Sequence, residues 1–77
     1  MSTTTRVTAG QKIRDARLNQ AKPLKQRELA TRIGVDPITV SRWERGVTKP
    51  SDLSRVLLAR ALGGHANDYL DDDEVAA

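Results

Sequence analysis

Apolar positions recur at spacings of three and four residues along most of the chain, which is the periodicity of amphipathic helices. No stretch alternates β-branched and polar residues in the way that a half-buried strand requires. The pattern predicts four helices over about residues 9–19, 26–33, 37–45 and 52–62, and a short fifth helix over about 66–71. We therefore expect an all-α fold, a compact bundle of four to five helices.

The two ends of the chain differ from this helical body. Residues 1–8 are rich in threonine and predict a flexible N-terminal arm. Residues 72–77 belong to an acidic run that begins at Asp71, and they predict an acidic tail with solvent-exposed charges. An alternative is a regulatory tail, which competes with phosphate for a basic surface or engages a partner. The predicted domain lies between the two ends, over residues 9–71.

Residues typical of helix ends mark the boundaries of the central helices. Gly34 stands where the second helix needs a left-handed residue at its C-terminus. Asp36 followed by Pro37 forms an N-cap with proline at the first helical position, which is a strong start signal for the third helix. Gly46 ends that helix, and Ser51 can cap the fourth. Only three residues therefore connect the second and third helices.

Such a short connection forces the second and third helices to cross at a steep angle, as in a helix-turn-helix. A small residue is needed at the crossing, and Ala30 supplies it. Further apolar residues of this pair occur at spacings that would bury one face of each helix against the first and fourth helices: Leu29, Ile33, Val35, Val40 and Trp43.

The fourth helix is apolar around most of its circumference, with Leu53, Val56, Leu57, Leu58, Ala59, Ala61 and Leu62. Such breadth has two interpretations. Either this helix is the central core helix, or it also covers the surface of a partner.

The third helix carries a stripe of residues that no core argument explains. If Val40 and Trp43 point inward, Ile38 lies roughly 200° around the helix from Val40 and points outward. The outer stripe then consists of Pro37, Ile38, Ser41, Arg42 and Arg45. In a DNA major groove the Arg42 guanidinium can donate two hydrogen bonds to guanine, and Ile38 can contact a thymine methyl. We predict base contacts from Pro37, Ile38, Ser41 and Arg42.

The net charge of +3 conceals a strong asymmetry along the chain. Up to Leu62 there are 13 basic and 5 acidic residues, whereas from Gly63 onward there are 5 acidic residues and no basic one. A basic body on so small a domain is typical of a protein that binds nucleic acid, although an anionic membrane or an acidic protein would also fit.

Composition excludes several classes of function. The chain has no cysteine and a single histidine, His65, so we expect no disulfide, no metal site and no cofactor. No catalytic set of residues is present, and we expect that the protein is not an enzyme. The longest apolar run, Val56 to Ala59, is too short to span a bilayer, and the absence of a signal peptide predicts a cytoplasmic protein without a membrane partner.

From Gly10 to about Leu70 the sequence resembles the lambda-Cro/phage-repressor-like (XRE-type) helix-turn-helix proteins. The segments that carry the resemblance are Ile13-Arg14-x-x-Arg17, Leu24-x-Gln26-x-x-Leu29-Ala30, Gly34-Val35, Val40-Ser41-x-Trp43-Glu44-x-Gly46, Lys49-Pro50 and Ala61-Leu62-Gly63. The resemblance implies a lambda-repressor-like bundle and binding to double-stranded DNA.

The resemblance also implies roles for residues outside the recognition stripe. Gln26 looks like the family's phosphate-anchoring glutamine at the start of the second helix. Arg17 and Glu44 look like the family's buried ion pair between the first helix and the end of the third, and Arg17 is a further candidate for a phosphate contact. The segment after the recognition helix, which usually touches the DNA backbone, contains Arg45, Thr48 and Lys49.

These observations predict a transcriptional regulator, a repressor that binds a pseudo-palindromic operator as a homodimer through residues 37–45. A homodimer is expected because one such module buries too little surface for tight specific binding. The apolar face of the fourth helix and the Tyr69-Leu70 region are the expected contact. Two alternatives remain open: an antitoxin-like module that masks a protein partner, and an accessory factor that bends DNA for excision.

Overall fold

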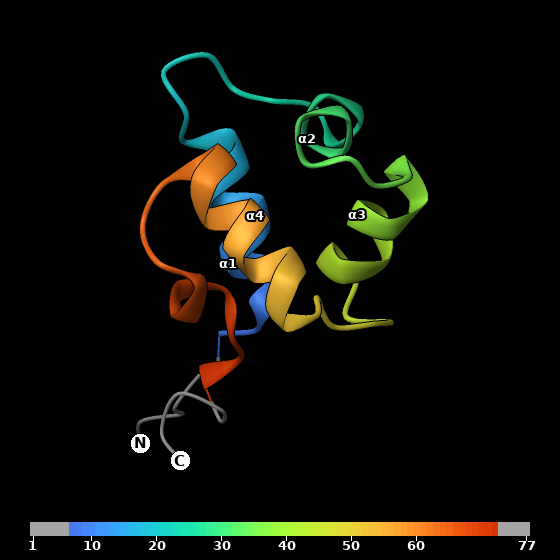
Figure 1. Cartoon of the computed structure of the whole chain (residues 1–77), viewed down its shortest axis with the longest axis vertical. Helices are drawn as coiled ribbons and strands as arrows, with labels where there is room; N and C mark the ends of the chain where they lie inside the picture. The colour runs from blue at the N-terminus through green and yellow to red at the C-terminus, as the bar shows by residue number, and fades with distance from the viewer. Residues whose placement is uncertain (1–6, 73–77) are drawn as a thin grey trace, which may run out of the picture.

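A computed structural model describes residues 7–72, and within this range every regular element is helical. The elements in chain order are α1 (Ala9–Leu18), α2 (Gln26–Ile33), α3 (Pro37–Glu44), α4 (Asp52–Leu62) and the 3-10 helix η1 (Ala66–Tyr69). In Figure 1, α4 crosses in front of α1, while α2 and α3 lie together on one side. The prediction of a compact all-α bundle is confirmed. Residues 1–6 of the predicted arm and 73–77 of the predicted tail lie outside the described range.

Side-chain caps explain where three of the helices begin. Thr8 Oγ1 accepts a hydrogen bond from the Gln11 amide of α1 at 3.1 Å. Asp36 Oδ1 accepts from the Ile38 amide at 3.1 Å, and Ser51 Oγ accepts from the Ser54 amide at 3.2 Å. Thr8, which the sequence pattern placed in the arm, is thus the N-cap of α1.

The turn between α2 and α3 depends on a glycine. Gly34 is the C-cap of α2 and has φ of 78°, a conformation that residues with a Cβ rarely adopt. Its amide donates to the Ala30 carbonyl at 2.9 Å, and the following amide of Val35 reaches the same carbonyl at 3.0 Å. Ala30 itself is completely buried. The turn therefore reverses the chain within three residues, which brings α3 against α2.

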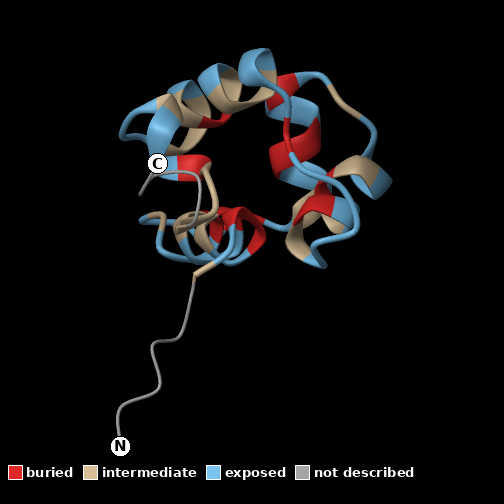
Figure 2. Cartoon of the chain, turned by 90° about the horizontal axis from the view of Figure 1, so that it is seen from below, coloured by how far each residue is buried: buried red, intermediate tan, exposed pale blue. Residues whose placement is uncertain are grey.

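A single core lies between the helices, and Figure 2 shows their buried parts facing one another around the centre of the molecule. Trp43 is 4% exposed and Val40 is fully buried, as their spacing predicts. The cluster of buried hydrophobic residues comprises Ile13, Leu29, Ala30, Ile33, Val40, Trp43, Leu58 and Tyr69. Every one of the five helical elements contributes to it.

Of the two interpretations of α4, the structure does not support a central core helix, and the second, a helix that also covers a partner surface, stays a prediction. Leu58 is its one buried residue, whereas Leu53 is 68% exposed and Val56 is 39% exposed. Leu57, Ala59, Ala61 and Leu62 are partly buried against the core. The small domain offers α4 a core on one side only, so part of its apolar surface remains open.

The part that Gly10 plays in the close approach of α1 to the end of α3 was not predicted from the sequence. Gly10 is buried, and a Cβ at this position would lie 2.8 Å from the Glu44 carbonyl oxygen and closer still to that of Trp43. Only a residue without a side chain allows this packing distance.

The fifth element is shorter than expected. A helix was predicted over residues 66–71, whereas the structure has a single 3-10 turn over Ala66–Tyr69. Tyr69 is 4% exposed and its hydroxyl donates to the Gly63 carbonyl at 2.8 Å. Burial, together with the nearby Asp68 carboxylate, raises the pKa of Tyr69. Its side chain therefore belongs to the core of the protomer.

Candidate nucleic-acid interface

The outer face of α3 is open to solvent along its N-terminal half. Ile38 is 50% exposed, Pro37 and Arg42 are also exposed, and Ser41 is half-buried. Within the range that the structure describes, the Arg42 side chain makes no hydrogen bond or ion pair, so its five N–H donors are available to a ligand. The structure thus places the four predicted base-contacting residues on one short helix with its core face fixed.

Ser41 and Arg45 are linked along this outer face. Arg45 Nε donates to Ser41 Oγ at 3.3 Å, one helical turn back, and Arg45 is the C-cap of α3. This contact orients the Arg45 guanidinium along the exposed side of the helix, three residues after Arg42.

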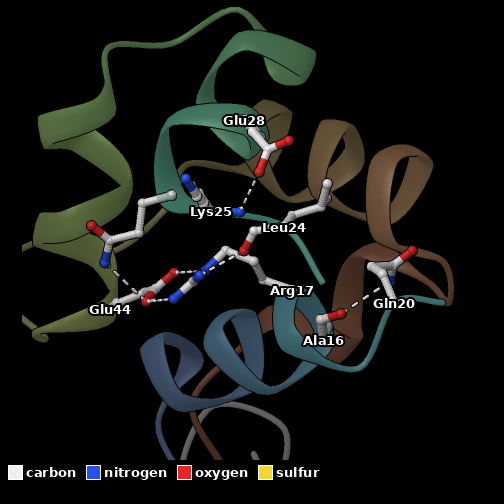
Figure 3. Close-up of polar contacts among 8 residues, drawn as sticks. Ala16, Arg17, Gln20, Leu24, Lys25, Glu28 and Glu44 are labelled. Atoms are coloured by element: carbon white, nitrogen blue, oxygen red, sulfur yellow. Dashed lines mark hydrogen bonds and ion pairs between the residues drawn. The ribbon is translucent and has the colours of Figure 1, made fainter. Parts of the chain in front are cut away.

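A buried ion pair joins α1 to the last residue of α3 (Figure 3). Arg17 Nε donates to Glu44 Oε2 and Arg17 Nη2 donates to Glu44 Oε1, each at 2.8 Å. The third nitrogen, Nη1, donates to the Leu24 carbonyl at 2.7 Å. The side chains are 9% and 4% exposed, respectively. All three guanidinium nitrogens of Arg17 are therefore engaged inside the protein.

The same carboxylate also holds Gln26, the first residue of α2. Gln26 Nε2 donates to Glu44 Oε1 at 3.1 Å. An ionised carboxylate only accepts hydrogen bonds, so the amide nitrogen must face Glu44. One N–H and the carbonyl oxygen of the Gln26 side chain are then left for another partner. The predicted phosphate anchor is thus oriented by the predicted ion pair.

The N-terminus of α2 lies open between basic residues. Its N-cap, Lys25, supplies no side-chain acceptor to the first turn, while its own amide donates to Glu28 Oε1 at 2.9 Å. Lys22, Lys25 and Arg27 are exposed around this end and line a shallow hollow with Pro23 and Glu28, whose negative charge offsets one of the three positive charges. Arg27 was not singled out from the sequence, since an exposed arginine on a helix is common. Uncapped amides, the helix dipole and these cations together favour an anion here.

The loop after α3 carries the other predicted phosphate contacts. Gly46 has φ of 77°, and the Val47 amide turns back to the Arg42 carbonyl at 2.9 Å. Arg45, Thr48 and Lys49 are all exposed. Lys49 Nζ lies 3.1 Å from Asp71 Oδ2, which is a carboxylate of the C-terminal segment.

Asp71 and Asp72 were expected to carry solvent-facing charges of the acidic tail. Instead, their carboxylates accept hydrogen bonds from backbone amides at the start of α1. The Ala9 amide donates to Asp71 Oδ1 at 2.6 Å, and the Val7 amide donates to Asp72 Oδ2 at 2.8 Å. Lys12 Nζ reaches Asp72 Oδ1 at 2.9 Å. The hydrogen bond from Ala9, and then Lys49 and Lys12, hold the pKa of Asp71 below its ordinary value against a desolvation effect. Lys12 and the Val7 amide likewise lower the pKa of Asp72.

Residues 7–72 show neither a metal-binding cluster nor a membrane-spanning helix. They contain no group of three or more histidine or acidic side chains arranged to hold a metal ion. None of their helices is long and apolar enough to cross a membrane.

Comparison with known families agrees with this geometry. A helix-turn-helix family model matches residues 13–68, from the middle of α1 to η1. The chain therefore belongs to the helix-turn-helix family of the Cro/C1 type and is a DNA-binding domain.

The structure is also similar to one solved in solution by nuclear magnetic resonance, that of the DNA-binding domain (1–76) of the P22 C2 repressor. The two share 28% sequence identity with a TM-score of 0.73, over 91% of this chain and 90% of the other. No curated protein sequence matches the chain.

Proposed function

We propose that this protein is a sequence-specific transcriptional regulator, a repressor that binds a pseudo-palindromic operator as a homodimer. The observation that carries the proposal is the division of α3 into two faces. Val40 and Trp43 are buried, whereas Ile38 and Arg42 on the opposite side are exposed. An exposed guanidinium and a methyl-bearing side chain on the solvent-facing side of such a helix suit a major groove. The similarity to the P22 C2 repressor domain supports the same function.

In this proposal α3 enters the groove with Pro37, Ile38, Ser41 and Arg42 toward the bases. Phosphates on either side are held near the C-terminal end of α3, because Gln26 is tied to Glu44 there and the loop with Arg45, Thr48 and Lys49 follows directly. Backbone contacts of this kind fix the register of the protein on the duplex without choosing the sequence.

Arg17 has a different role from the other cations of the interface. Its three guanidinium nitrogens are directed at Glu44 and Leu24. We therefore assign Arg17 to holding Glu44, and through it Gln26, in place of the direct phosphate contact that was expected.

The homodimer would form through the open side of α4. Leu53 and Val56 are the exposed large apolar residues of this helix, and Val56 borders a hollow with Ala59, Arg60, Gly64, His65 and Ala66. Tyr69, expected at this contact, is occupied in the core of the protomer. Two modules on half-sites about 34 Å apart would double the contacts of one.

Binding selection from random duplex DNA tests the proposal, with wild type, Arg42→Ala and the matched control Arg14→Ala at one fixed salt concentration. We expect wild type and Arg14→Ala, which alters an exposed arginine on α1, to enrich the same two-fold motif. Arg42→Ala should lose preference at one base pair of each half-site, with discrimination falling by about 1–3 kcal/mol there.

Two results would contradict the proposal. If wild type enriches no motif, the protein is not a sequence-specific regulator, and the antitoxin-like alternative is favoured. Enrichment of a single asymmetric half-site would contradict binding as a homodimer. Strong bending of the bound duplex would favour an accessory DNA-bending factor.

A further inference from the structure

Asp71 brings the C-terminal segment against the loop after α3, which carries proposed phosphate contacts. One oxygen of its carboxylate accepts from the Ala9 amide at 2.6 Å, and the other lies 3.1 Å from Lys49 Nζ. Asp71 and Lys49 also border one small hollow between the start of α1 and the loop after α3, together with Gly10, Gly46 and Thr48. A single carboxylate thus connects the first turn of α1 to a residue assigned to the DNA backbone.

The fold, and not Lys49, sets the position of this carboxylate. Asp71 accepts from the first amide of α1, where the helix dipole favours a negative charge. The neighbouring residue is fixed by a hydrogen bond from the Asp72 amide to the Val7 carbonyl at 3.0 Å. The Asp71 side chain is 23% exposed, whereas the Lys49 side chain is 65% exposed. A long and mostly exposed lysine side chain therefore meets an anion whose position other contacts have already fixed.

We propose that Asp71 competes with DNA phosphate for Lys49 and so lowers the affinity of the protein for DNA. The inference rests on the proposed function, in which Lys49 faces a phosphate. A phosphate drawn to Lys49 would stand close to the Asp71 carboxylate, so the attraction of one cation is offset by the repulsion of a fixed anion. Coupling of this kind is reciprocal, and DNA that engages Lys49 weakens one of the contacts that hold the C-terminal segment.

The substitution Asp71→Asn distinguishes the effect of the Asp71 charge on DNA binding from the effect of its hydrogen bond to α1. Asparagine keeps a side-chain oxygen that can accept from the Ala9 amide, but it removes the negative charge beside Lys49. Asp72→Asn is the matched control, because it removes one charge from the adjacent residue, whose contacts are with Val7 and Lys12 and not with Lys49. Lys49→Met and the double variant Asp71→Asn/Lys49→Met complete a double-mutant cycle.

The measurement is the dissociation constant for a mixed-sequence duplex by fluorescence anisotropy over a series of salt concentrations. For Asp71→Asn we expect tighter binding, several-fold at low salt, and a salt dependence steeper by up to about 0.9 in log–log slope, the value for one further phosphate neutralised. Lys49→Met should weaken binding, and adding Asp71→Asn to it should change little. The Trp43 fluorescence of each variant shows that it is folded under the conditions used.

Three outcomes would overturn the inference. Equal tightening by Asp71→Asn and Asp72→Asn would mean that general electrostatics acts, without a specific contact. Tightening that persists in the Lys49→Met background would mean that Asp71 does not act through Lys49. Unchanged binding by Lys49→Met would mean that this lysine meets no phosphate. The proposed function would still stand if Arg42→Ala loses preference at one base pair of each half-site. Failure of the proposed function itself differs from all three, since wild type would then select no DNA motif.

Discussion

Gln26 Nε2 donates a hydrogen bond of 3.1 Å to Glu44 Oε1, the oxygen that also receives Arg17 Nη2 at 2.8 Å. The first residue of α2 is thus tied to the last residue of α3 by a carboxylate that is itself neutralised from α1. Because the carboxylate is 4% exposed, its contacts are shielded from competing water. The shared carboxylate thus holds the proposed phosphate anchor at a fixed place beside the proposed recognition helix.

The first prediction concerns the stability of the buried pair. Arg17→Met should lower the free energy of unfolding by about 3–5 kcal/mol, because Glu44 is left buried without a counter-charge. This loss is comparable with the whole stability expected of a domain of this size. Urea unfolding monitored by Trp43 fluorescence measures it. The double variant Arg17→Met/Glu44→Leu should recover much of the loss, and a single variant as stable as wild type would contradict the role of the pair.

A second prediction separates anchoring from base recognition. Gln26→Ala should weaken DNA binding by about 1.5–3 kcal/mol, the value of a hydrogen bond to a charged group, with the selected motif unchanged. The control is Thr31→Ala, at an exposed position of α2 whose hydroxyl bonds within the helix to the Arg27 carbonyl. A changed motif in Gln26→Ala would show that this residue contacts bases.

The third prediction tests the contact between α1 and the end of α3. Gly10→Ala should reduce stability by about 1–3 kcal/mol, because its Cβ would overlap the backbone of Trp43 and Glu44, which cannot move away as a flexible side chain could. Arg14→Ala, at an exposed position of the same helix, should stay within about 0.5 kcal/mol of wild type. Chemical denaturation of both variants provides the comparison, and equal stability would mean that the helices can separate without cost.

A fourth prediction addresses the homodimer. Val56→Asp should raise the dimer dissociation constant by about tenfold or more, because an apolar side chain of this size contributes about 1.5 kcal/mol or more when buried. Leu18→Asp is the control, as Leu18 is 43% exposed on α1. Sedimentation equilibrium with and without operator DNA gives the association constants. If both variants dimerise as wild type does, the partner surface lies elsewhere.

The last prediction is a pH dependence of stability. The folded-state pKa values of Asp71 and Asp72 are below the ordinary value of 3.8, since backbone amides and lysines stabilise their charged forms. Their contribution is therefore complete above pH 3.8 and is lost as the pH falls through the folded-state pKa values. Thermal unfolding between pH 2 and 6 should show less acid destabilisation in Asp71→Asn/Asp72→Asn than in wild type. An equal loss of stability with falling pH in both proteins would show that the Asp71 and Asp72 carboxylates do not contribute in this way.

The sequence by itself determined the four α-helices, the caps of the central ones and the two faces of α3. These features depend on local chemistry: the spacing of Val40 and Trp43, the N-cap at Asp36 and the left-handed glycine at position 34 each act within a few residues. The Arg17–Glu44 pair and the role of Gln26 came from family resemblance, because no spacing rule links residues on different helices.

Tertiary structure alone decided how distant segments meet. It set Gly10 against α3, gave Glu44 three donors from Arg17 and Gln26, and brought Asp71 and Asp72 back to the start of α1. It also left Leu53 exposed, where the composition of α4 allowed either burial in the core or contact with a partner. From sequence alone, an acidic run predicts solvent-exposed charges and an apolar helix favours burial in the core. Which of these charges and methyl groups finds a partner depends on where the packed helices place the chain ends and on how much surface so small a core can cover.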